Sequence, residues 1–190
     1  MGTMVEMRYV VFDLEATCWK EPRPRELMEI IEIGAVMLAS AAGPQVAEFA
    51  RFVRPVAEPL LSAFCKELTS IRQEQVDAAD AFPAVFRDFV AWAGGGEFDL
   101  CSWGAYDVRQ MRQDCRRHAV PFPDGFDRHI NLKDEFARLF NVKRCGMAAA
   151  LRYAGLPLLG THHRGIDDAR NISRLATIIL PRLEAEASAV

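Results

Sequence analysis

The stretch that decides the fold of this chain reads Val10-Val11-Phe12-Asp13-Leu14-Glu15-Ala16-Thr17-Cys18. Its apolar start, Tyr9 to Phe12, predicts a buried strand, and two carboxylates, Asp13 and Glu15, follow where that strand ends. Residues two apart on a strand face the same side of a sheet. At about 4 Å two such charges repel by roughly 4 kcal/mol at an effective dielectric of 20. A divalent cation between them would offset this repulsion, whereas two solvated acids at a strand exit would need no ion.

Two further strands are expected soon after the first. Residues 28–38 are apolar and β-branched, and because Glu29 and Glu32 interrupt them, we expect part of this strand to be an edge or a bend. The Gly-Pro pair at 43–44 indicates a hairpin turn. Residues 46–53 should therefore return as an antiparallel strand.

Helices are expected to fill most of the remaining chain. Apolar residues at i, i+3, i+4, i+7 and i+8 in the range 82–90 predict a helix whose aromatic stripe faces the core. A fourth strand is expected at 97–103, with short helical turns in 60–76. The other expected helices cover 107–119, 131–140, 147–153 and 166–183. This order indicates one three-layer α/β domain built on a mixed sheet.

Composition sets a few outer limits on function. The chain has 190 residues, of which 51% are hydrophobic and 26% charged. No apolar run reaches the roughly 18 residues that cross a membrane, and residues 1–8 do not resemble a secretory signal. Five scattered cysteines without a CxxC pair predict a reducing, cytoplasmic location and argue against a zinc site. The net charge of -3 argues against a non-specific nucleic-acid coating protein but not against a metal-dependent nuclease.

Polar residues of one chemistry recur where later elements begin. Asp107 opens the helix after the fourth expected strand, and His163 and Asp168 flank the start of the last helix. Strand ends and helix starts are where an α/β sheet gathers functional groups. Taken singly, each acid could cap a helix or stabilise its dipole, and His163 could be an ordinary loop residue.

Together these residues resemble the DEDDh branch of the DnaQ-like 3′-to-5′ exonucleases. Asp13 and Glu15 match the first motif of that family, Asp-x-Glu, and Asp107 matches the second, an Asp after a strand. His163 and Asp168 match the third, a His followed five positions later by an Asp. The segments 12–18, 64–71 and 165–172 resemble the ERI1-like exoribonucleases more closely.

The resemblance implies a fold and an activity. The expected fold is α/β, ribonuclease H-like, with three layers and a central five-stranded mixed sheet, in a single DEDDh exonuclease domain spanning residues 1–190. The expected activity is hydrolysis of single-stranded nucleic acid from its 3′ end, with RNA favoured, releasing nucleoside 5′-monophosphates. The alternatives are a DNA-directed proofreading exonuclease and a non-catalytic RNA-binding domain of the same fold. No obligate protein partner is expected.

The resemblance also implies a two-metal mechanism. Asp13, Glu15, Asp107 and Asp168 would hold two Mg²⁺ ions, with Mn²⁺ as a substitute, because hard carboxylate oxygens suit these ions. Four negative charges would balance the two divalent ions, and Asp13 would be shared by both. His163 would act as the general base beside Glu15, since its ordinary pKa near 6.5 suits that role at neutral pH.

Two assignments in the third motif have rivals, because the same offset of five residues joins His162 to Asp167 and His163 to Asp168. The Asp-Asp pair of the family, whose second member coordinates, favours Asp168. By the same resemblance, the residues expected to bind substrate are Ala16 and Thr17 at the terminal sugar, Phe64 and Tyr106 as base-stacking side chains, and Arg109 as a phosphate contact.

The substrate-binding expectations also have plainer alternatives. Phe64 could be a core phenylalanine. Arg109 could belong to a solvated helix face together with Arg112, Arg116 and Arg117, the other candidates for phosphate contacts on that helix. Arg164, beside His163, is a further candidate for a phosphate contact.

Overall fold

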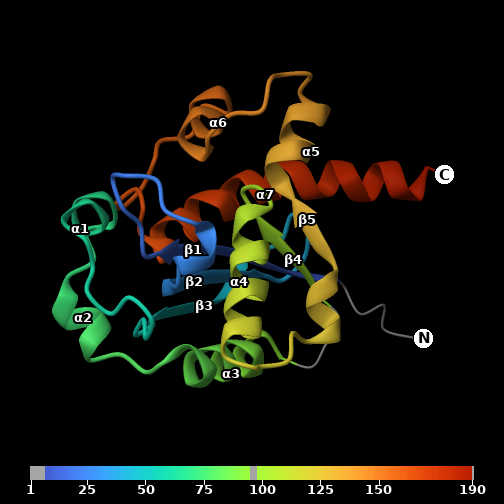
Figure 1. Cartoon of the computed structure of the whole chain (residues 1–190). Helices are drawn as coiled ribbons and strands as arrows, with labels where there is room; N and C mark the ends of the chain where they lie inside the picture. The colour runs from blue at the N-terminus through green and yellow to red at the C-terminus, as the bar shows by residue number, and fades with distance from the viewer. Residues whose placement is uncertain (1–6, 95–97, 190) are drawn as a thin grey trace.

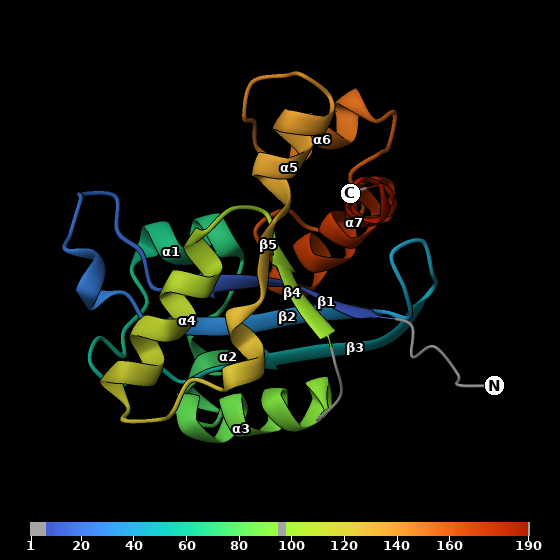
Figure 2. The same cartoon turned by 90° about the vertical axis from the view of Figure 1, so that its right-hand side faces the viewer.

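The computed structural model describes residues 7–94 and 98–189, and within these ranges a mixed sheet lies between two layers of helices (Figures 1 and 2). Its strands are β1 (Arg8–Ala16), β2 (Ile30–Leu38), β3 (Gln45–Phe52), β4 (Phe98–Ser102) and β5 (His129–Asn131). They form a five-stranded sheet of order β3-β2-β1-β4-β5. Strand β1 pairs antiparallel with β2 and parallel with β4, while β2 and β3 pair antiparallel and β4 and β5 parallel. The expected ribonuclease H-like architecture is confirmed.

The helices cover both faces of this sheet. In chain order they are η1 (Arg25–Leu27), α1 (Ala63–Thr69), α2 (Gln73–Asp77), α3 (Phe82–Ala93), α4 (Tyr106–Arg117), η2 (Asp124–Asp127), α5 (Leu132–Leu139), α6 (Met147–Tyr153) and α7 (Gly165–Ser188). Helices α5, α6 and α7 lie on one face, and α3 and α4 lie on the other (Figure 2). None of the described helices is long and apolar enough to cross a membrane.

Strand β1 contributes to the core on both sides of the sheet. Val10, Phe12 and Leu14 pack into the cluster beneath α3 and α4, whereas Tyr9 and Val11 pack into the cluster beneath α7. Because side chains alternate along a strand, the acids that follow Val11 in this alternation lie on the α7 face. The sheet therefore presents both carboxylates of the first motif to the helix that carries the third.

Strand β2 is not the edge strand that its glutamates suggested, although its ladder with β1 is irregular where Glu15 pairs with Glu32 and Ala16 with Ile30. All nine of its residues are buried, and it pairs with β1 on one side and β3 on the other. Just before it, the buried Glu29 accepts backbone N–H groups of Val56, Ala57 and Glu58, each at 2.9 Å. Buried carboxylates are tolerated when such donors replace water. The prediction was wrong because these donors come from distant segments.

Other boundaries follow local sequence closely. Helix α3 contains the predicted aromatic stripe in the core and ends at Gly94, whose φ of 81° is readily available to glycine. Residues 1–6, 95–97 and 190 lie outside the described ranges, including the predicted start of the fourth strand at Glu97. Helix α7 runs to Ser188, five residues beyond its expected end. Strand β5 was not predicted from its own residues, because three residues are too few to show the alternation of a strand.

Helix α7 starts directly against β2. A Cβ at Gly34 would lie only 2.0 Å from the carbonyl carbon of Gly165, the first residue of α7. Only glycine permits two backbones to approach this closely. Since Gly34 pairs with Asp13 in the ladder, this contact positions the first turn of α7 beside the acids of β1.

Candidate active site

Three carboxylates from two elements converge on the α7 face of the sheet. Asp13 and Glu15 come from β1 and Asp168 from the first turn of α7, and one oxygen of each lies within 4.8 Å of the others. They line a cavity of about 290 Å³ together with Tyr106 and Asp107. The alternation of β1 and the starting point of α7 thus bring the first and third motifs together, as expected.

Asp107 lines the same cavity from helix α4. It is the second residue of α4, and its Oδ1 accepts the backbone N–H of Leu14 at 3.3 Å. Burial raises the pKa of this carboxyl to about 6, although the Leu14 N–H and the Ser102 hydroxyl favour its charged form. Asp107 is not part of the set within 4.8 Å, so it stands beside the other three acids.

The acids of β1 carry an unbalanced charge. Burial, followed by repulsion from Asp107, Glu15 and Asp168, raises the pKa of Asp13 well above its usual value. Burial, followed by repulsion from Asp168 and Glu32, raises the pKa of Glu15 to about 9. Two solvated acids at a strand exit would show neither effect. The pKa values of both acids are therefore raised by burial and by the negative charges around them.

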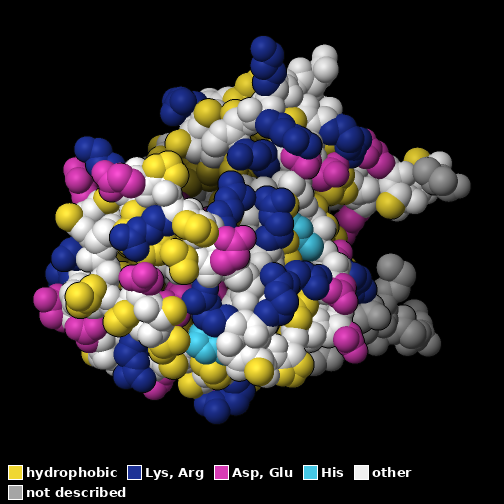
Figure 3. Space-filling view, viewed as in Figure 1, with side chains coloured by type: hydrophobic (Ala, Val, Ile, Leu, Met, Phe, Trp, Pro, Cys, Tyr) yellow, Lys and Arg dark blue, Asp and Glu magenta, His cyan; other side chains and the backbone are white. Residues whose placement is uncertain are grey.

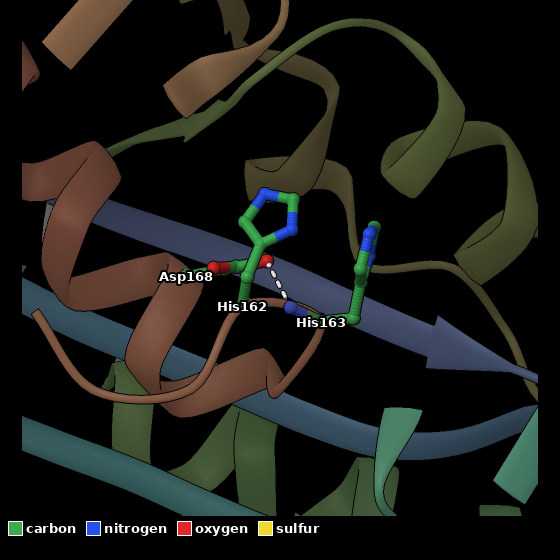
Figure 4. A group of neighbouring side chains, drawn as sticks. All are labelled: His162, His163 and Asp168. Carbon is green, nitrogen blue, oxygen red and sulfur yellow. Dashed lines mark hydrogen bonds between the residues drawn. The ribbon is translucent and has the colours of Figure 1, made fainter. Parts of the chain in front are cut away.

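His162 and His163 lie side by side in the loop before α7, near Asp168 (Figure 4), and both line the cavity. Their ring centroids are 4.0 Å apart, and a ring nitrogen of each lies within 4.8 Å of an Asp168 oxygen. The backbone N–H of His163 donates to Asp168 Oδ2 at 3.0 Å. This bond holds His163 in the left-handed region with φ 62°, a conformation that is uncommon outside glycine. Burial, with the neighbouring His162, lowers the pKa of His163.

Asp167 and Asp168 have different surroundings in the structure. Asp167 accepts the backbone N–H of Thr161 at 2.9 Å and a guanidinium N–H of Arg170 at 3.0 Å. Its carboxylate also lies against Gly160. Asp167 therefore holds the loop, and Asp168 is the acid that lines the cavity.

Behind the cavity lies an ion pair that sequence reasoning missed. Glu32 is 2% exposed and opposes Glu15 in the β1–β2 ladder. It receives two N–H groups of Arg164 at 3.1 Å each and the backbone N–H of Gly165 at 2.9 Å. Arg164 was expected as a phosphate contact but instead anchors the histidine loop to β2. The only signal for this ion pair would have been the pairing of Glu32 with Glu15, and recognising that pairing requires the register of β1 against β2.

The expected contacts to the terminal sugar are already used within the fold. The Ala16 carbonyl accepts the Cys65 thiol at 3.7 Å. The buried Thr17 hydroxyl accepts the backbone N–H of Glu29 at 3.0 Å, and the Thr17 N–H donates to the Glu29 carbonyl at 2.8 Å. Thr17 thus joins the ends of β1 and β2.

The two expected stacking residues lie in different hollows. Tyr106 lines the acidic cavity, and its hydroxyl donates to Gln110 Oε1 at 3.4 Å. Phe64 is 36% exposed on α1, so it is not a core residue. It lines a separate hollow with Trp19 and does not line the acidic cavity.

The basic residues of α4 divide into two groups. Arg112 pairs with Asp127 at 2.5 Å and stacks over Phe122, and Arg117 donates to the Met28 carbonyl at 3.1 Å. These two side chains stabilise the fold. Arg109 and Arg116, in contrast, are exposed and line a hollow along α4 that also includes Tyr106.

The comparison with known proteins identifies the family. A family model described as exonuclease matches residues 10–176. The chain belongs to the exonuclease family. It is 32% identical over 188 residues to ERI1 exoribonuclease 2 of Danio rerio, covering 88% of this chain and 34% of that protein. It is also 32% identical over 180 residues to 3′-5′ exoribonuclease 1 of Rattus norvegicus, covering 90% of this chain and 52% of that protein.

Among solved structures, this exonuclease resembles the nuclease domain of 3′hExo, a DEDDh family member bound to rAMP. The TM-score is 0.87 with 29% identity, and 95% of each chain is covered. These similarities identify the chain as an ERI1-like member of the DEDDh exonucleases, as the motifs predicted. The chain spans only about a third of the length of the first relative.

Membership of the DEDDh exonucleases implies use of a divalent metal, and the residues present fit one. Asp168 Oδ1 is buried and has no hydrogen-bond partner, although Oδ2 of the same carboxylate is satisfied. A buried, unpartnered carboxylate oxygen is costly unless a cation or donor meets it. It belongs to the set of three acids within 4.8 Å, and all their ligand atoms are hard oxygens.

Proposed function

We propose that this chain is a metal-dependent 3′-to-5′ exoribonuclease that shortens single-stranded RNA from its 3′ end and releases nucleoside 5′-monophosphates. The observation that carries the proposal is the convergence of Asp13, Glu15 and Asp168 within 4.8 Å, with Asp107 in the same cavity. The names of the relatives, 3′-5′ exoribonuclease 1 and ERI1 exoribonuclease 2, support RNA as the substrate. The chain would act as one exonuclease domain, since both helical layers pack on one sheet.

The four acids would hold two Mg²⁺ ions, with Asp13 between both, and Mn²⁺ would substitute. A pair of divalent ions supplies a counter-charge for the phosphate, a lower pKa for the attacking water and stabilisation of the leaving oxygen. The raised pKa values of Asp13 and Glu15 support this assignment, because they report a need for positive charge. A reducing, cytoplasmic location remains a prediction from the cysteines.

His163 would accept the proton of the attacking water at a ring nitrogen. Its lowered pKa supports this role, because the imidazole is then neutral at pH 7 and can take up a proton. The backbone bond to Asp168 fixes its position relative to the acids. His162 would restrict the motion of the His163 ring through their contact.

The 3′-terminal nucleotide would lie against Tyr106, which offers an aromatic face at the edge of the cavity. Base stacking on such a face contributes about 1–3 kcal/mol and tolerates any base. Ala16 and Thr17, whose polar groups are bonded within the fold, would hold in place the end of β1 against which the terminal sugar lies, because Leu14 and Glu15 just before them line the cavity. Phe64 would contact substrate only by way of its separate hollow beside Trp19.

The test uses two 5′-labelled single strands of one sequence, RNA and DNA, with Mg²⁺ or with a chelator. Wild type is compared with Asp13→Asn and with Asp124→Asn, a matched charge change on an exposed residue outside the cavity. We expect a ladder that shortens from the 3′ end of RNA and is lost with chelator and with Asp13→Asn only. Faster shortening of DNA would reassign the substrate. No shortening with Mg²⁺ or Mn²⁺ would refute the activity and leave a binding domain.

A further inference from the structure

A second hollow, which we call the α4 groove, opens beside the acidic cavity. It has a volume of about 270 Å³ and runs along the outer side of α4. Tyr106 lines both the groove and the acidic cavity, so the two hollows meet at this side chain. A strand whose 3′ end lies in the cavity could therefore continue into the groove past one aromatic ring.

The α4 groove is basic although the whole chain has a net charge of -3. Four of its lining residues are arginines, and the one acid among them is Glu26. Arg25, Arg109 and Arg116 are exposed, and in the part of the chain that the structure describes none of them forms an ion pair. Figure 3 shows Lys and Arg side chains gathered over α4 on this face. Three of the four groove arginines therefore carry positive charge without an ion-pair partner among the described residues, while Arg112 pairs with Asp127.

Hydrogen bonds join the two segments that line the groove. Gln113 Nε2 donates to the carbonyls of Arg25 and Met28, both at 3.0 Å, and Gln110 Nε2 donates to the Met28 carbonyl at 3.1 Å. These bonds attach the segment that carries Arg25 to α4. Arg25 and the arginines of α4 therefore belong to one stable surface.

The spacing of the arginines on α4 suits a nucleic-acid backbone. Arg109 and Arg116 stand at i and i+7, two turns apart on one side of the helix, with Arg112, which is paired to Asp127, between them. At 1.5 Å per residue the stripe is about 10 Å long. A stacked strand advances about 3.4 Å per nucleotide, so the stripe matches about three phosphates. Guanidinium groups bind phosphate with paired, charge-assisted hydrogen bonds.

We propose that the α4 groove binds the sugar-phosphate backbone of the single strand, on the 5′ side of the nucleotide held in the acidic cavity. The inference rests on the proposed function for the identity of the strand. Because the contacts are to phosphate, binding is independent of sequence but dependent on length and salt. A strand that fills both hollows has at least about four nucleotides, so the chain binds such strands more tightly than it binds a dinucleotide.

The test measures equilibrium binding of a fluorescein-labelled ten-nucleotide RNA and a labelled dinucleotide, in chelator so that no strand is cut. The variant is the double substitution Arg109→Gln with Arg116→Gln. The charge-matched control is Arg72→Gln with Arg87→Gln, two exposed arginines that do not line the groove. We expect the preference of the double variant for the longer strand to fall at least about tenfold. The slope of log K against log salt concentration should also become less steep, by about 0.7 per lost phosphate contact.

Three outcomes would overturn the α4 groove as a nucleic-acid site. The first is an unchanged preference and salt dependence in the double variant. The second is an equal loss in the control variant, which would report net charge alone. The third is a labelled ten-residue poly-glutamate peptide that binds wild type more tightly than the RNA does, which would reassign the groove to an acidic protein segment. A wild type that binds RNA through these arginines but shortens no strand would retain the groove and refute the exonuclease.

Discussion

Replacing Gly34 by alanine would test how the fold assembles the candidate active site. The added Cβ would lie 2.0 Å from the Gly165 carbonyl carbon and 2.1 Å from the Ile166 nitrogen. Ordinary contacts begin at about 3.4 Å, so α7 must move away from β2 by about 1.4 Å. The atoms that would clash are backbone atoms, so a change of side-chain rotamer cannot relieve the contact.

This displacement should affect activity more than stability. Overpacking of this kind costs about 1–3 kcal/mol, which for a chain of this size lowers Tm by roughly 2–12 °C. The first turn of α7 carries Asp168 and holds His163 through the bond at 3.0 Å. Both would move relative to Asp13, and a misplacement of about 1 Å can reduce a rate about 100-fold. We expect at least that loss in the rate of RNA shortening.

The assay combines thermal unfolding with initial rates of RNA shortening. Gly125→Ala is the matched control, because a Cβ there meets nothing within 4 Å. It should keep the wild-type rate and change the free energy of unfolding by no more than about 1 kcal/mol. If Gly34→Ala keeps both the rate and the Tm of wild type, the backbone contact does not position α7 and the reasoning fails.

Three further predictions concern charge and protons. Asp13→Asn should raise Tm in chelator, since one repelling charge is gone, and should abolish the rise in Tm that millimolar Mg²⁺ gives wild type; calorimetry that finds the same Mg²⁺ shift in both proteins would contradict this. His163→Ala should lower the rate of RNA shortening about 10²–10⁴-fold and more than His162→Ala does; the reverse order in initial rates would make His162 the base. Burial raises the pKa of Asp114 from 3.8 to about 6, so the folded state holds this proton more tightly and the free energy of unfolding should fall as pH rises between about 4 and 6. Asp114→Asn should reduce that fall by up to about 3 kcal/mol, and parallel urea-denaturation profiles for the two proteins would refute it.

Much of the candidate site could be predicted from the sequence, because the features that define it are local in the chain. Side chains two apart on a strand share a face, so Asp13 and Glu15 had to lie together once β1 was recognised. The aromatic stripe of α3 likewise needed only a helical period. Motif order then pointed to Asp107 and to the Asp167–Asp168 pair as the remaining candidate acids.

Features that depend on register or on loop contacts were not predictable. The pairing of Glu32 with Arg164 needs the alignment of β1 with β2 and the path of the loop before α7. Choosing Asp168 over Asp167 needs the bonds that Asp167 makes to Thr161 and Arg170. Strand β5 is defined only by its pairing with β4. In each case the deciding partner is distant in sequence or belongs to an irregular segment.

The alternation of β1 also links the accuracy of folding to activity. A slip of β1 by one residue would exchange its two faces. Asp13 and Glu15 would then enter the aromatic core around Phe86 and Phe89, where an unpaired carboxylate costs several kcal/mol. Slipped chains would therefore not survive as stable molecules. The acids of the candidate active site would thus select against misassembled chains, and in a refolded preparation the number of competent sites should equal the number of folded chains.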